Sequence, residues 1–166
     1  MHNIEIGCDF INLIKENEKL IFKICHIYTN QAEDFKDLYQ EIVCQIWKSY
    51  NSFKYECKPT TWLYKVALNT ALTYNKKNNR HSSIFGTSLK FPEIPDNSTF
   101  ENDEDITLLY KAIEQLNDLD KAIIFMYLEN KNHEEIASIT GISISNVSTR
   151  LMRIKEKLRK YMNINN

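Results

Sequence analysis

Residues that interrupt helices are scarce in this chain of 166 residues, which has only three glycines and three prolines. Glycine and proline destabilise a helix interior more than any other residue types, so long stretches of the chain are free to be helical. Hydrophobic residues make up 43% of the chain and charged residues 26%, a balance that lets a globular chain bury a core. An all-α fold is therefore predicted.

Two of the three prolines lie in one stretch, residues 78–105, which has little apolar periodicity. This stretch carries six acidic residues and only two basic ones. A structureless connection of this length is uncommon inside a compact domain, so it is expected to divide the chain. We predict two small helical domains, residues 1–80 and 106–166, joined by a flexible acidic linker over residues 81–105.

No segment approaches the roughly 18 consecutive apolar residues of a membrane-spanning helix, and the N-terminal residues do not have the pattern of a signal peptide. A cytoplasmic protein without membrane insertion is expected. The cysteines form no C-x-x-C pair, so they are expected to be reduced, partly buried residues on helices, with no metal site and no cofactor. They are Cys8, Cys25, Cys44 and Cys57.

Apolar residues recur at helical spacing through the first domain. The first predicted helix buries one stripe, formed by Phe10, Leu13, Ile14, Ile21, Ile24, Cys25 and Tyr28. A second helix, for which Asp34 is the expected cap, has an apolar face built on Leu38, Ile42 and Ile46, with Tyr39, Val43 and Trp47 beside them. A third helix should begin near Thr60 and bury Trp62, Leu63, Val66, Ala67 and Thr70.

The opposite face of the second predicted helix is polar. Its residues are spaced to lie together, and they are Asp37, Gln40, Glu41, Cys44 and Lys48. Because charged helix faces are ordinarily solvated surface, the pattern alone favours that interpretation over a binding site.

The third predicted helix combines a polar, basic side with aromatic neighbours. The polar side holds Lys65, Asn69, Thr73, Lys76 and Lys77, and the aromatic residues are Phe53, Tyr55, Trp62 and Tyr64. Single-stranded DNA is bound by this combination, since cations hold phosphates and aromatic faces accept unstacked bases. Aromatic residues at helical spacing more often form a core, and the pattern alone leaves both interpretations open.

The second domain contains a helix-turn-helix pattern. Two helices precede it, with inward stripes of Ile106, Leu109, Ile113 and Leu116, then Leu119, Ile123, Ile124 and Tyr127. Asn132 and Glu135 fit a capping box, Gly141 can take the positive φ of a turn, and Ser143 can cap the last helix. That helix should bury Val147, Leu151, Ile154 and Leu158, which leaves a polar row of Ser145, Asn146, Ser148, Thr149, Arg150 and Arg153.

The second helix of such a motif enters the major groove of DNA. Asparagine can read adenine and arginine can read guanine through two hydrogen bonds, so Asn146 and Arg150 are the candidates for direct base recognition. Six basic residues lie between Arg150 and Lys160 against one acidic residue, Glu156. The alternative is a plain helical hairpin with a basic outer face.

Three segments, in this order, resemble extracytoplasmic-function sigma factors of the sigma-70 family. DLYQEIVCQIW (residues 37–47) resembles the helix of that family that binds RNA polymerase, and TTWLYKVALNTALTYNKK (residues 60–77) resembles its promoter-melting helix. HEEIASITGISISNVSTRLMRIKEKLRK (residues 133–160) resembles its helix-turn-helix for the upstream promoter element. Within it, NVSTRLMRIKEKL resembles forms common in the Bacteroidetes lineage.

The resemblance implies a sigma factor that binds core RNA polymerase, directs it to specific promoters and promotes strand opening. The residues it implies for contact with the clamp coiled coil of the polymerase are Asp37, Gln40, Glu41, Cys44 and Lys48. Those implied for the -10 promoter element are Phe53, Tyr55, Thr61, Trp62, Lys65, Asn69, Thr73, Lys76 and Lys77. Those implied for the -35 element are Ser145, Asn146, Ser148, Thr149, Arg150 and Arg153. The implied partners are core RNA polymerase (its clamp coiled coil and its flap), promoter DNA and an anti-sigma factor.

Two other function classes fit parts of the sequence. A helix-turn-helix regulator that binds duplex DNA alone would differ in not needing polymerase, although the net charge of -1 predicts weak binding to free duplex DNA. An enzyme is the other class, because His133 and Glu134 match the start of the H-E-x-x-H zinc motif. Ala137 occupies the position of its second histidine, and no Gly-rich phosphate loop or nucleophile elbow is present, so a protein without enzymatic activity is expected.

Overall fold

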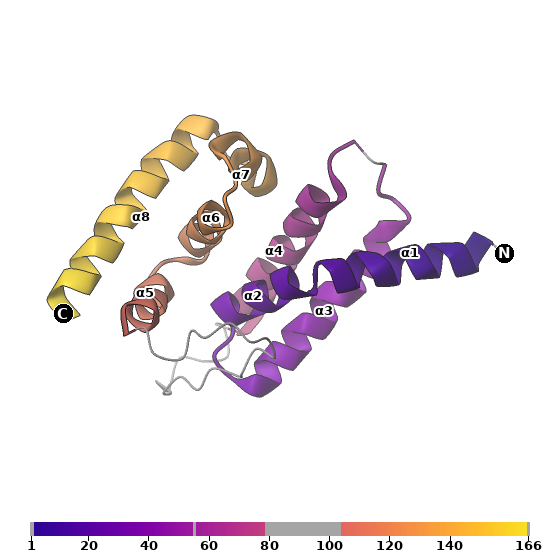
Figure 1. The fold of residues 1–166 in the computed structure, drawn as a ribbon, viewed down its shortest axis with the longest axis horizontal. Helices are drawn as coiled ribbons and strands as arrows, with labels where there is room; N and C mark the ends of the chain where they lie inside the picture. The colour runs from indigo at the N-terminus through magenta and orange to yellow at the C-terminus, as the bar shows by residue number, and fades with distance from the viewer. Residues whose placement is uncertain (1, 55, 79–103, 166) are drawn as a thin grey trace. The chain divides into compact units, whose positions relative to one another are not determined.

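The computed structural model describes residues 2–54, 56–78 and 104–165. The described residues form eight α-helices and no β-strand (Figure 1), which confirms the predicted all-α class. The chain divides into two compact units, Met1–Pro92 and Glu93–Asn166. The predicted linker lies almost entirely outside the described residues, and only its last two positions are described, in a helix that begins at Glu104. The predicted domain limits therefore stay a prediction.

The first unit contains four helices. They are α1 (His2–Glu16), α2 (Glu18–Tyr28), α3 (Ala32–Tyr50) and α4 (Pro59–Asn78). Helices α2, α3 and α4 pack against one another around fully buried side chains. The largest of these are Ile21, Ile24, Leu38, Ile42, Ile46 and Leu63.

The predicted first helix is in fact two helices, which break at Asn17. The Asn17 side chain donates through Nδ2 to the carbonyl oxygen of Leu13 over 2.8 Å, and its backbone N–H donates to the carbonyl of Ile14 over 3.2 Å. A side chain that competes for backbone carbonyls in this way interrupts the helical hydrogen bonds. Phe10 and the α2 part of the stripe are buried, whereas Leu13 and Ile14 stay partly exposed.

Helix α3 begins before the predicted cap. Its first residue is Ala32, and Gln31 occupies the cap position without a side-chain hydrogen bond. Asp34 lies instead in the first turn, where the helix dipole favours a carboxylate, so the prediction that Asp34 caps this helix is wrong. The predicted apolar face of the helix is confirmed by the complete burial of its three central residues, although Trp47 beside them is 49% exposed.

Helix α4 begins at Pro59, a position where proline is favoured because the first helical turn needs no N–H donor there. The buried residues form a stripe rotated from the predicted one: Leu63, Tyr64, Ala67, Leu68 and Ala71. Trp62, Val66 and Thr70 lie at its edge and are partly exposed. Tyr64 is therefore a core residue and not an exposed aromatic platform.

The second unit contains the other four helices described. They are α5 (Glu104–Glu114), α6 (Asp118–Leu128), α7 (His133–Thr140) and α8 (Ile144–Asn165). Helix α8 contacts α5, α6 and α7 through the predicted stripe, which is buried throughout. Tyr127, which was expected to face inward, is 37% exposed, and the Lys155 ammonium lies 3.9 Å from its ring centroid.

The local signals of the helix-turn-helix are confirmed at α7 and α8. The Glu135 N–H donates to Asn132 Oδ1 over 2.8 Å, and the Asn132 N–H donates to Glu135 Oε2 over 3.1 Å, which completes the capping box. Gly141 has a φ of 76° at the end of α7. The Asn146 N–H then donates to Ser143 Oγ over 3.2 Å at the start of α8.

The described cysteines differ in their exposure to solvent. Cys25 is fully buried, and desolvation raises the pKa of its thiol to about 12. Cys44 and Cys57 are exposed free thiols, and Cys57 lies between α3 and α4, so the prediction of partly buried helical cysteines is wrong for this pair. The Cys8 side chain lies outside the described residues. Among the helices that are described, none is long and apolar enough to cross a membrane.

Candidate polymerase and nucleic-acid interfaces

The polar face of α3 is exposed along its length. All five residues predicted for it are solvent-accessible, and we call them the α3 polar face: Asp37, Gln40, Glu41, Cys44 and Lys48. Glu41 Oε1 accepts a hydrogen bond from Gln45 Nε2 over 2.8 Å, one turn along the helix. The opposite side of α3 is fixed in the core, so this face is presented on a rigid element.

Helix α4 carries a second exposed row. We call it the α4 basic row: Lys65, Asn69, Thr73, Lys76 and Lys77. The helix contains no acidic residue, so nothing within it neutralises its three lysines. The Thr73 hydroxyl donates to the carbonyl oxygen of Asn69 over 2.8 Å, which leaves the lysines and the Asn69 amide as the groups best suited to a polyanion.

Two aromatic rings meet beside this row. The ring of Phe53, which follows α3, stacks on the ring of Trp62 in α4, with centroids 4.8 Å apart. The ring of Tyr50 lies 6.4 Å from Trp62 in a tilted arrangement. Phe53, Trp62 and the neighbouring Thr61 are partly exposed, whereas Tyr55 lies outside the described residues. The structure thus brings Phe53 and Trp62 together. Tyr64, which was also predicted to belong to this aromatic group, is buried in the core and cannot contact a base there.

The outer row of α8 is exposed except at one position. Ser145, Asn146, Ser148, Thr149 and Arg153 are exposed, and Arg150 is partly covered. The hydroxyls of Ser148 and Thr149 have partners inside the protein: Ser148 Oγ lies 2.9 Å from His133 Nδ1, and Thr149 donates to the Ser145 carbonyl over 3.0 Å. Asparagine and arginine are the residue types that read a base through two hydrogen bonds, so Asn146 and Arg150 are the candidates for base contacts, and the exposed Arg153 is suited to a phosphate.

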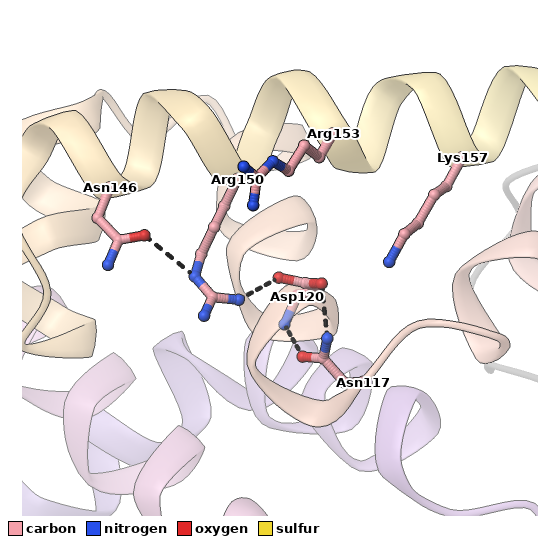
Figure 2. A pocket seen from close by; sticks show the side chains of 6 residues that line it. All are labelled: Asn117, Asp120, Asn146, Arg150, Arg153 and Lys157. Atoms are coloured by element: carbon pink, nitrogen blue, oxygen red, sulfur yellow. Dashed lines mark hydrogen bonds and ion pairs between the residues drawn. The ribbon is translucent and has the colours of Figure 1, made fainter.

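Arg150 is tied to α6 (Figure 2). Its Nη1 lies 2.8 Å from Asp120 Oδ1, and its Nε donates to Asn146 Oδ1 over 3.2 Å. Asp120 and its partner Asn117 were not predicted from the sequence, although their three-residue spacing before an apolar run is a helix-capping signal. The cavity beside this ion pair has a volume of about 260 Å³ and is lined by Asn117, Asp120, Asn146, Arg150, Arg153 and Lys157.

The described residues contain no group of three or more His, Cys, Asp or Glu side chains placed to hold a metal ion. His133, the first residue of the zinc-like segment, contacts the Ser148 hydroxyl.

Two family models match the chain. The model of Sigma-70 region 2 matches residues 13–81, and the model of Sigma-70, region 4 matches residues 106–158. The chain belongs to the sigma-70 family of RNA polymerase sigma factors. The resemblance drawn from three sequence segments is thereby confirmed. In this sigma factor, region 2 contains the α3 polar face and the α4 basic row, and region 4 contains the helix-turn-helix.

Characterised relatives agree with this family. The sigma factor is 28% identical to the ECF RNA polymerase sigma-E factor of Haemophilus influenzae, over 75% of this chain and 72% of that protein. It is 23% identical to the RNA polymerase sigma factor SigV of Bacillus subtilis, over 90% of this chain and 88% of that protein. As a sigma factor, the protein directs RNA polymerase to promoters, and its partners are core RNA polymerase and promoter DNA.

Solved structures share the fold. The sigma factor RpoE of Bartonella quintana, solved in complex with the anti-sigma factor NepR, matches with a TM-score of 0.76 and 18% identity, over 95% of this chain and 99% of that one. CnrH, solved in complex with the cytosolic domain of CnrY, matches with a TM-score of 0.68 and 14% identity, over 95% and 89% of the two chains.

Proposed function

We propose that this sigma factor binds core RNA polymerase through the α3 polar face, with the clamp coiled coil of the largest subunit as the contacted element. The observation that carries the proposal is the exposure of all five residues on one side of a helix that is anchored in the core on its other side by the fully buried Leu38, Ile42 and Ile46. Such a helix presents two acids, an amide and a lysine without a change in the fold. The backbone that carries these residues is already held in place by the core, so binding does not require it to rearrange, which favours affinity.

The α4 basic row and the Phe53 and Trp62 rings are proposed to promote strand opening. The lysines would hold phosphates of the non-template strand, and the aromatic rings would accept an unpaired base. Contacts that form only with the unpaired strand stabilise the open state, so binding shifts the equilibrium toward opening. This mechanism needs no catalytic step by the protein, and the proposed place of action is the cytoplasm.

Helix α8 is proposed to read the upstream promoter element, while the second unit contacts the polymerase flap. Asn146 and Arg150 would make the base contacts, and Arg153 would contact the phosphate backbone. An anti-sigma factor is proposed as a regulatory partner, because the structural relative RpoE was solved in complex with one.

The test is transcription with core RNA polymerase from a bacterium of the Bacteroidetes lineage on genomic DNA fragments. Run-off transcripts measure initiation, and permanganate reactivity of thymines measures strand opening. The substituted protein combines Asp37→Ala, Gln40→Ala and Glu41→Ala. Its matched control combines Asp9→Ala, Asn12→Ala and Glu16→Ala, which removes two acids and an amide from exposed positions of α1.

Promoter-specific transcripts that need both the protein and core polymerase are expected. They should be lost with the α3 substitutions and kept with the α1 control. If the protein instead shifts duplex DNA alone and never supports initiation, it is a stand-alone regulator and the proposed function is wrong. If the α1 control abolishes transcripts as completely as the α3 substitutions, the α3 polar face is not the polymerase contact.

A further inference from the structure

A hydrogen-bonded network joins the start of α6 to the exposed row of α8 (Figure 2). Asp120 Oδ1 contacts Arg150 Nη1 over 2.8 Å, and Asp120 Oδ2 accepts from Asn117 Nδ2 over 2.7 Å. Arg150 Nε donates to Asn146 Oδ1 over 3.2 Å. Both carboxylate oxygens of Asp120 therefore have partners, and one chain of contacts connects α6 to two candidate base-reading residues.

Burial makes Asp120 unusual. Its side chain is 8% exposed, and it is the only charged residue buried among those that the structure describes. A buried carboxylate is stable only when it is paired, so the Arg150 guanidinium is strongly favoured at this position. The Arg150 side chain is itself 33% exposed, so it is held by Asp120 without being hidden from a ligand.

The remaining donors of Arg150 suit base recognition. A guanidinium has five N–H donors in a planar fork, and the contacts to Asp120 and Asn146 use one at Nη1 and one at Nε. Three donors remain, which is enough for the two hydrogen bonds by which arginine reads guanine. Arg153 and Lys157 line the same cavity and form no ion pair with described residues, so their positions are not restrained in this way.

We propose that Asp120 is a positioning residue for promoter recognition. It holds the Arg150 fork, and through it the Asn146 amide, in one orientation toward the bases, while Asp120 itself does not touch DNA. Arg153 and Lys157 supply positive charge that any DNA sequence can use. This proposal rests on the proposed reading of the upstream element by α8.

The test compares base discrimination by full-length proteins with core RNA polymerase. A promoter that the unsubstituted protein transcribes is varied one base pair at a time across its upstream element, and run-off transcript is measured for each variant. Asp120→Ala, Arg150→Ala and the double substitution are compared. Core binding by fluorescence anisotropy and thermal unfolding are measured in parallel.

Glu135→Ala is the matched control. Glu135 occupies the third position of α7 after its cap Asn132, as Asp120 does in α6 after Asn117, and each acidic residue takes part in helix capping. The hydrogen bonds and the ion pair of Glu135 are with Asn132 and Lys131, and those of Arg150 are with Asn146 and Asp120. A loss that merely reflects a weakened helix start should therefore follow either substitution.

With Asp120→Ala, we expect the preference for one base pair to fall at least about fivefold while core binding is unchanged. Arg150→Ala should lose the preference at the same position, and the double substitution should lose no more, because both act through one guanidinium. Glu135→Ala should keep the full preference. If Asp120→Ala does not fold, Asp120→Asn replaces it, since the amide keeps the shape and loses the ion pair, and the preference should again fall at that position.

The proposal is overturned if Asp120→Ala lowers transcription equally on every promoter variant, or if it and Arg150→Ala affect different base pairs. It is also overturned if Glu135→Ala erases the preference to the same extent. If Asp120→Ala keeps the base-pair preference, the positioning role of Asp120 is refuted. The proposed function then still stands, because the protein remains an active sigma factor. Absence of polymerase-dependent transcription by the unsubstituted protein would refute the proposed function itself, and the positioning role with it.

Discussion

The ring of Phe53 stacks on the ring of Trp62, with centroids 4.8 Å apart and planes inclined by 28°. Phe53 follows α3 and Trp62 lies in the first turn of α4, so the pair joins two elements at the edge of the first unit's core. Because both rings are partly exposed, the pair presents an aromatic surface next to the α4 basic row.

Replacing Phe53 by alanine should reduce strand opening about fivefold or more, because stacking of a base on an aromatic ring contributes about 1–3 kcal/mol. Permanganate reactivity at the promoter measures the open fraction. Phe53→Tyr keeps the ring and serves as the control, which should open DNA as the unsubstituted protein does. Full opening by Phe53→Ala, with unchanged core binding, would show that this ring does not hold a base.

Lys76 and Lys77 lie exposed in the last turn of α4. If each contacts a phosphate of the unpaired strand, Lys76→Gln and Lys77→Gln should each reduce the slope of open-complex formation against salt, on logarithmic axes, by about 0.7. Filter binding of open complexes over a range of salt concentrations measures the slope. Lys36→Gln, an exposed change on α3, should leave the slope unchanged. If Lys76→Gln and Lys77→Gln both keep the slope of the unsubstituted protein, as Lys36→Gln should, these phosphate contacts are excluded.

Gly141 ends α7 with a φ of 76°, and a Cβ atom added there would meet no atom within 4 Å. The effect of Gly141→Ala is therefore conformational, and it should lower the free energy of unfolding of the helix-turn-helix by about 1–2 kcal/mol. Gly141→Asn should lower it less, because asparagine adopts left-handed conformations more readily. Hydrogen exchange of the α7 and α8 amides measures the change. Unchanged exchange in Gly141→Ala would mean that the turn adopts another conformation in solution.

Cys25 should resist alkylation while the protein is folded. Burial raises the pKa of its thiol from 9.0 to about 12, so the reactive thiolate is scarce at pH 8 and the sulfur is inaccessible. Iodoacetamide followed by peptide mass spectrometry should modify Cys44 and Cys57 in the native protein, and Cys25 only in urea. Native modification of Cys25 at the rate of Cys57 would contradict its burial.

The same shift predicts how stability changes with pH. The Cys25 thiol ionises near pH 9 in the unfolded chain but keeps its proton up to about pH 12 in the fold. Above pH 9 the unfolded state therefore binds fewer protons, and the free energy of unfolding falls as pH rises. Cys25→Ala should make this dependence shallower between pH 9 and 11, as measured by urea unfolding. An unchanged dependence would assign the loss of stability to other groups.

Much of the local structure could be predicted from the sequence. The capping box at Asn132, the left-handed turn at Gly141 and the cap at Ser143 each depend on hydrogen bonds or dihedral angles within a few residues. The buried stripe of α8 and the exposed α3 polar face follow from helical periodicity, because side chains three or four residues apart share a face. The family resemblance also rested on short segments of this kind.

Other features depended on contacts between helices. The apolar periodicity continues across Asn17, so it did not predict the break between α1 and α2. Periodicity also placed Trp62 instead of Tyr64 in the core, because the buried side of α4 is decided by how this helix packs against α2 and α3. The ion pair of Asp120 and Arg150 joins residues 30 positions apart. Helical spacing within one segment predicts which residues share a face. Only the packing of α6 against α8 determines that Asp120 meets Arg150, and this contact holds the Arg150 guanidinium in place.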